Sequence, residues 1–225
     1  MPTILKAILC DVDGVLVDTE GLHFQAWDWI CRDIGGQPLT QEEHATLVGK
    51  DGPVIMRELS QMKGFGGDLT KLNDRCREKY IELRQTGNIP VIMENVMLLR
   101  EFAELYSGLR FAAVSSDTHD HIQQNLRVAG LENFFELAVS AHSDGLKKKP
   151  APDVWLVAMK RLGVAPEECL AFEDSPAGVE SVTSAGVRVV ALPSPSTVSC
   201  SFPTAHTVIK PGERKNAREI LARVM

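Results

Sequence analysis

The sequence predicts an α/β fold in which a doubly wound parallel sheet carries an inserted helical cap. Short, continuously apolar runs alternate with helix-period patterns at the start of the chain and again after about residue 90. Such runs are typical of parallel strands that are covered on both faces. Between residues 19 and 89 only helical patterns occur. Repeated strand–helix units imply a parallel sheet with right-handed crossovers.

The first expected strand begins at Ile4 and ends in two aspartates, Asp11 and Asp13, which Gly14 follows. The carboxyl ends of strands in open α/β sheets are where ligands bind. Later expected strands lie at Phe111–Val114, Leu137–Val139, Leu170–Phe172, Val187–Leu192 and Thr207–Ile209. Expected helices between and after them are Leu98–Leu105, Ile122–Ala129, Trp155–Leu162, Pro176–Gly186 and Ala217–Val224.

These patterns predict two domains. The α/β core comprises residues 1–18 and 90–225, and residues 19–89 form the cap. Expected cap helices are Phe24–Ile34, Glu42–Val48, Val54–Gln61 and Leu69–Gln85. Gly35-Gly36 ends the first of these helices because glycine is a poor helix former.

Composition narrows the class of protein. The 225 residues are 44% hydrophobic and 24% charged, which is typical of an ordered globular protein. The net charge of −6 argues against nucleic acid as a partner. Five scattered cysteines favour reduced thiols, and no signal peptide or bilayer-length apolar segment is evident. We therefore expect a cytoplasmic protein with no membrane partner.

Polar residues follow several of the expected strands and predict one site at the sheet edge. They are Asp11, Asp13, Ser115, Lys149, Glu173 and Asp174. A carboxylate can attack phosphorus, and a second carboxylic acid can protonate the leaving oxygen and then activate water. A lysine and a hydroxyl can hold phosphate oxygens, and a divalent cation between the acids would offset their repulsion. Singly, each residue also has a structural interpretation: a polar turn, a solvated basic run, or an acid pair at a helix N-terminus.

Together these segments resemble the haloacid dehalogenase superfamily, in the branch similar to β-phosphoglucomutase and phosphoglycolate phosphatase. The matching segments are Asp11–Glu20, Ser115-Ser116, Lys149–Asp153 and Glu173–Gly178. The resemblance implies that Asp11 is the nucleophile and a Mg²⁺ ligand. It implies that Asp13 is the general acid/base, with its backbone carbonyl on the metal. Dehalogenation is disfavoured because the family's dehalogenases lack an acid at that position.

The same resemblance assigns the remaining site residues. Ser115 and Lys149 would bind phosphate, Asp174 would ligate Mg²⁺ directly, and Glu173 would support it through water. Gly14 and Ser116 would contact the substrate through the anion-binding loops. His23 either lies over the substrate, as in relatives with Asp-Thr-Glu-x-x-His, or is a surface histidine.

Two further features favour structural interpretations. His119-Asp120-His121 has the spacing of a metal site, but it lies at an expected helix start, where Asp117 or Thr118 would be the cap. Trp27 and Trp155 have core spacing, which predicts packing rather than substrate contact.

The cap departs from the family pattern. Gly52 stands where β-phosphoglucomutases have the arginine that grips a second phosphate, and Met93-Glu94-Asn95 replaces the usual Pro-Gly. The expected activity is therefore Mg²⁺-dependent hydrolysis of a small phosphorylated metabolite, such as a sugar phosphate. The alternatives are a phosphosugar mutase, with Lys50 or Arg57 in place of the arginine, and a non-catalytic metal-binding module on the same fold.

Overall fold

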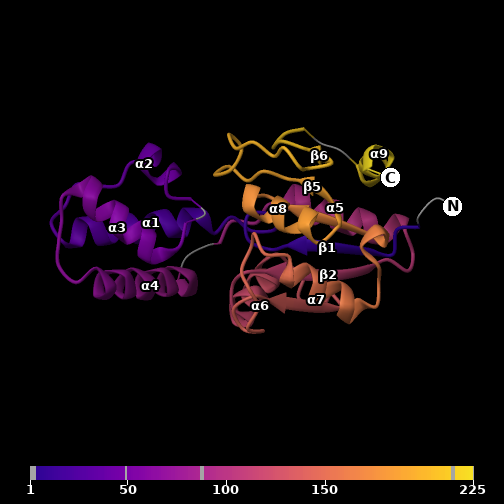
Figure 1. Cartoon of the computed structure of the whole chain (residues 1–225), viewed down its shortest axis with the longest axis horizontal. Coiled ribbons are helices and arrows are strands. Elements are labelled where there is room, and N and C mark those ends of the chain that lie inside the picture. The colour runs from indigo at the N-terminus through magenta and orange to yellow at the C-terminus, as the bar shows by residue number, and fades with distance from the viewer. Residues whose placement is uncertain (1–3, 49, 87–88, 214–215, 225) are drawn as a thin grey trace. The chain divides into compact units, whose positions relative to one another are not determined.

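The computed structural model describes residues 4–48, 50–86, 89–213 and 216–224, and it divides the chain into two compact units (Figure 1). The core unit comprises Met1–Asp18 and Val91–Met225, and the cap unit comprises Thr19–Pro90. Of the two boundaries predicted from the sequence, the one after Asp18 coincides with this division, and the one near residue 90 lies one residue away. No helix in the described ranges combines the length and the apolar character needed to cross a membrane.

The core unit is built on a six-stranded parallel sheet, which confirms the predicted fold class. The strand order is β3-β2-β1-β4-β5-β6. The strands are β1 (Ala7–Asp11), β2 (Arg110–Ser115), β3 (Leu137–Ser140), β4 (Cys169–Glu173), β5 (Arg188–Ala191) and β6 (Thr207–Val208). All five residues of β1 and of β4 are buried, as expected for central parallel strands.

Helices cover both faces of the sheet. They are α5 (Met93–Leu105), α6 (His119–Val128), α7 (Asp153–Leu162), α8 (Pro176–Ser184) and α9 (Ala217–Val224), with a 3₁₀ turn at Pro166–Glu168. Leu9 and its register partners Ala112 and Ala171 share one hydrophobic cluster with Trp155 of α7. On the opposite face, Phe172 contacts Phe102 of α5, with ring centroids 5.7 Å apart. Alternate strand residues therefore supply the two apolar layers.

The segment that follows β1 is tied back into the core unit. Val17 forms an antiparallel bridge with Val91, and the Ile92 N–H donates to the Leu16 carbonyl at 2.9 Å. The Asn95 side chain donates to the Val15 carbonyl at 2.8 Å. The atypical Met93-Glu94-Asn95 stretch therefore begins α5 and anchors the loop after β1.

The cap unit is helical, as its periodicity predicted. It contains α1 (Glu20–Asp33), α2 (Gln41–Ala45), α3 (Gly52–Lys63) and α4 (Leu69–Thr86). A capping box between Thr40 and Glu43 starts α2. This helix ends at Ala45, earlier than the predicted Val48, and Gly49 lies outside the described residues. Trp27 is buried, so its predicted packing role is confirmed.

Candidate active site

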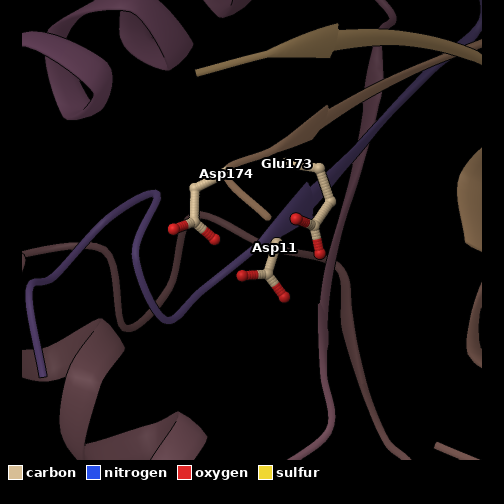
Figure 2. Close-up of side chains that lie close together, drawn as sticks. All are labelled: Asp11, Glu173 and Asp174. Carbon is tan, nitrogen blue, oxygen red and sulfur yellow. The ribbon is translucent and has the colours of Figure 1, made fainter. Parts of the chain in front are cut away.

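Three carboxylates from two neighbouring strand ends lie together in the core unit (Figure 2). Asp11 ends β1, Glu173 ends β4, and Asp174 follows directly. The parallel register, which pairs Cys10 with Phe172, brings both strand ends to the same edge of the sheet. All three side chains are buried, and one ligand atom from each lies within 4.8 Å of the others.

Lys149 brings a buried cation to these acids from the loop between β3 and α7. Its ammonium group donates to an oxygen of Asp11 and, at 2.6 Å, to Glu173 Oε1. It also lies 4.7 Å from the centroid of the Trp155 ring. The side chain of Lys149 is only 9% exposed, whereas the neighbouring Lys147 and Lys148 are exposed. Trp155 is fully buried, which confirms its packing role, and its ring also faces the lysine.

The close approach of these groups shifts their pKa values. Burial raises the pKa of Asp11 well above its usual range, although Lys149 opposes the shift. Burial and the charge of Glu173 raise the pKa of Asp174 to about 8, against hydrogen bonds from Ser194 and Thr197. Burial lowers the pKa of Lys149, but Asp11 and Glu173 outweigh it and raise that pKa overall. Protonation of Asp11 or Asp174 therefore reduces the electrostatic repulsion among the buried carboxylates.

The donor set fits a hard divalent cation. The Lys149 ammonium pairs with Asp11 and Glu173 but not with Asp174, so the three carboxylates, when fully ionised, carry excess negative charge. Carboxylate oxygens are the ligands that Mg²⁺ prefers in proteins. Among the described residues, Asp11, Glu173 and Asp174 form the one group of three side chains suited to hold a metal ion.

Two glycines allow the acids to approach the backbone this closely. A Cβ atom on Gly14 would lie 2.2 Å from Asp174 Oδ2, and its φ of +83° also disfavours other residues. A Cβ atom on Gly178 would lie 1.8 Å from Glu173 Oε1. The Gly14 N–H donates to the Val17 carbonyl at 2.8 Å, so the substrate contact expected for Gly14 stays a prediction.

The carboxylate of Asp13 is held at both oxygens. Ser115 Oγ donates to Asp13 Oδ2 at 3.0 Å, and Asn125 Nδ2 donates to Asp13 Oδ1 at 2.9 Å. Ser115 Oγ in turn accepts from the Asp117 N–H at 3.0 Å. Asn125 was missed by sequence reasoning. Its only signal was a polar residue among the apolar positions of α6, next to Leu126 and three residues after Ile122.

The polar residues around the start of α6, from Asp117 to His121, make local structural contacts. Thr118 is the N-cap of α6 and accepts from the His121 N–H. His121 Nδ1 lies 2.7 Å from Asp117 Oδ2, and His119 Nε2 lies 3.4 Å from Asp144 Oδ1. In the described chain these histidines join no group of three metal-ligating side chains. Ser116 is half-buried, and its substrate contact stays a prediction.

In the cap unit, His23 is part of an aromatic cluster. Its ring stacks on Tyr80 with centroids 4.0 Å apart, and Arg84 donates to the Tyr80 hydroxyl at 3.0 Å. Lys50 forms an ion pair with Glu58 at 2.7 Å. The stacking does not decide between the two interpretations of His23, whose substrate contact stays a prediction.

The chain is similar to known hydrolases over most of its length. The family described as "haloacid dehalogenase-like hydrolase" matches residues 5–186. Protein CbbY of Rhodobacter capsulatus is 34% identical, covering 89% of this chain and 91% of that protein. Hexitol phosphatase A of Escherichia coli is 31% identical, covering 85% and 84%.

A solved structure shows the same relationship. The crystal structure of a β-phosphoglucomutase homologue from Thermotoga maritima superposes with a TM-score of 0.73 at 26% identity. The match covers 98% of this chain and all of that one. The predicted family is therefore confirmed: the chain belongs to the haloacid dehalogenase-like hydrolases, in the branch that resembles β-phosphoglucomutase.

Proposed function

We propose that the protein is a Mg²⁺-dependent phosphatase that hydrolyses a small sugar phosphate through an aspartyl-phosphate on Asp11. The observation that carries this proposal is the contact of the buried Lys149 ammonium with both Asp11 and Glu173, beside Asp174. A nucleophilic carboxylate, a phosphate-binding cation and an acidic metal cluster thus occupy one sheet edge. Phosphoryl transfer to a carboxylate needs these three elements together.

Asp11 and Asp13 divide the chemistry. A carboxylate oxygen of Asp11 attacks phosphorus, the bond from phosphorus to the ester oxygen breaks, and Asp13 gives its proton to that oxygen. Water then attacks the phosphorus of the aspartyl-phosphate, and Asp13 takes a proton from it. Inorganic phosphate leaves, and the Asp11 carboxylate is regenerated.

The other site residues bind and neutralise charge. Lys149 and Ser115 hold phosphate oxygens. Asp11, Asp174 and the Asp13 carbonyl would ligate Mg²⁺ directly, with Glu173 acting through water. When bound, this ion supplies charge neutralisation between the carboxylates and the dianionic phosphate.

A sugar phosphate is the substrate class that the relatives favour, since one of them is named a hexitol phosphatase at 31% identity. The cap supports hydrolysis rather than mutase chemistry. Gly52 offers no charge, and Lys50 is paired with Glu58. The mutase alternative rests on the likeness to the β-phosphoglucomutase homologue. The binding-module alternative is disfavoured by the complete set of acids.

The proposal is tested by measuring the phosphate released from a panel of phosphorylated metabolites, once with Mg²⁺ present and once with EDTA. We expect wild-type protein to hydrolyse at least one sugar phosphate only with Mg²⁺, and Asp11→Asn to be folded and inactive. Release of phosphate by pure Asp11→Asn at the wild-type rate would refute the mechanism. A mutase would instead convert a hexose 1-phosphate, with a bisphosphate primer, to the 6-phosphate faster than it frees phosphate. Bound metal without turnover of any ester would indicate the binding module.

A further inference from the structure

Asn125 is a buried amide in an otherwise apolar part of α6. Its side chain is fully buried, and the neighbouring helix positions Ile122 and Leu126 are buried and apolar. Burying an amide is unfavourable unless its polar atoms are hydrogen-bonded. The Asn125 Nδ2 group donates to Asp13 Oδ1 at 2.9 Å. A leucine has a similar size and would pack equally well at this position of α6. The amide is therefore explained by its hydrogen bond to the Asp13 carboxylate.

Ser115 holds the other oxygen of the same carboxylate. Its hydroxyl donates to Asp13 Oδ2 at 3.0 Å while accepting from the Asp117 N–H. A hydroxyl has only one proton to donate. Ser115 therefore cannot donate to Asp13 and to a phosphate oxygen at the same time. Asn125 has no such conflict, because its side chain on α6 is fully buried and closed off from solvent.

We propose that Asn125 is a positioning residue that anchors Asp13 through the reaction. This inference rests on the proposed phosphatase function. When a phosphoryl group arrives, the Ser115 hydroxyl turns to it and gives up its hydrogen bond to Asp13 Oδ2. Asn125 keeps Oδ1 in place, so Oδ2 is the oxygen that delivers the proton to the leaving group. The Asp13 carboxylate is therefore already correctly oriented when the proton is transferred.

The activity of Asn125→Leu on two esters with different leaving groups distinguishes a loss of Asp13 positioning from a general loss of folded enzyme. Departure of an alkoxide needs protonation, whereas a nitrophenolate is stable without it. We expect Asn125→Leu to lower kcat/KM for an alkyl phosphate by roughly ten- to a hundredfold, as misplacement of a reacting group does. For p-nitrophenyl phosphate the loss in kcat/KM should be less than about threefold, since this constant reports the transfer to Asp11 and nitrophenolate leaves without an acid. Gln123→Leu makes the same change at an exposed position of α6 and should leave both values unchanged.

A double-mutant cycle with Asp13→Asn provides the second readout. If Asn125 acts through Asp13, Asn125→Leu should cost no further activity in the Asp13→Asn background. Single-turnover release of the alcohol from the alkyl phosphate measures this residual activity, because the nitrophenyl ester should show little loss in either background. An equal loss in both backgrounds, or an equal loss on both esters by a folded variant, would overturn the inference and leave Asn125 a structural residue.

Folding is checked by urea unfolding of each variant. Should Asn125→Leu fail to fold, Asn125→Ala carries the same test, because it removes both N–H donors and introduces no charge beside Asp13. Wild type and Asp11→Asn are assayed alongside. An inactive wild type, or a fully active Asp11→Asn, defeats the proposed function itself. An active wild type, an inactive Asp11→Asn and an Asn125→Leu that behaves like Gln123→Leu defeat only the role of Asn125.

Discussion

Replacement of Lys149 by methionine removes the one cation among the described residues that forms ion pairs with the acidic cluster, while keeping most of the side-chain volume. The variant loses the ion pairs to Asp11 and Glu173 and the contact with the Trp155 ring. In metal-free protein the three buried carboxylates then lack a counter-charge, and the folded state can relieve them only by taking up protons.

The structure sets the expected size of this effect. Breaking a buried ion pair by removing one partner costs about 3–5 kcal/mol, because the other charge stays buried and uncompensated. The lost cation–π contact adds up to about 2 kcal/mol in a desolvated site. Proton uptake by the carboxylates offsets part of this cost. We therefore expect Lys149→Met to lower the free energy of unfolding by about 3–5 kcal/mol at neutral pH in EDTA.

Magnesium should recover more stability in this variant than in wild type, because the site has become more negative and binding to the folded state stabilises it. Urea unfolding in EDTA and in MgCl₂ measures both quantities. Lys148→Met is the matched control, since its side chain is exposed and should change neither. If Lys149→Met unfolds at the wild-type urea concentration in EDTA and gains no more from Mg²⁺, Lys149 does not neutralise the acids and the electrostatic reasoning is wrong.

Three further predictions concern other parts of the structure. Gly14→Ala should weaken Mg²⁺ binding and lower stability, because its Cβ would overlap Asp174; an unchanged Mg²⁺ titration would contradict this. Without metal, burial raises the pKa of Asp174 to about 8, so the folded state holds more protons than the unfolded state. Stability in EDTA should then fall as pH rises from about 5 to about 8, and a flat profile of urea midpoints would count against the burial of these acids. In the cap, Tyr80→Phe removes the acceptor of the Arg84 hydrogen bond and should cost about 1 kcal/mol by urea unfolding, whereas an equally stable variant would show that this bond contributes nothing.

The sheet and the acidic cluster could be predicted because their determinants are local. The apolar runs before Asp11 and before Glu173 each predict a buried strand, and both segments are buried strands in the structure. Parallel strands share one carboxyl edge, so the acids that follow them meet there without further information. Of three consecutive lysines, Lys149 is the one that directly precedes Pro150 in the matching segment Lys149–Asp153, and the structure gives it alone the buried contacts.

The partners of these acids could not be predicted, because they depend on the packing of distant segments. Asn125 looks like an ordinary polar residue of an amphipathic helix until α6 is packed beside Asp13. Thr197 lies in a proline-rich loop whose course has no periodic signal, yet its hydroxyl donates to Asp174 at 3.3 Å. Asn95 likewise gains its role only when its side chain meets the Val15 carbonyl.

Chemical trapping tests the central claim most directly. Enzyme mixed with Mg²⁺ and a substrate ester is quenched in acid, reduced with borohydride and digested for mass spectrometry. Borohydride converts an aspartyl-phosphate to homoserine. Mass spectrometry should therefore detect homoserine at position 11 of the wild type, and unmodified aspartate there when the ester is left out. Homoserine at a different aspartate, or steady turnover with no modified residue, would contradict the account of Asp11 as the group that receives the phosphoryl.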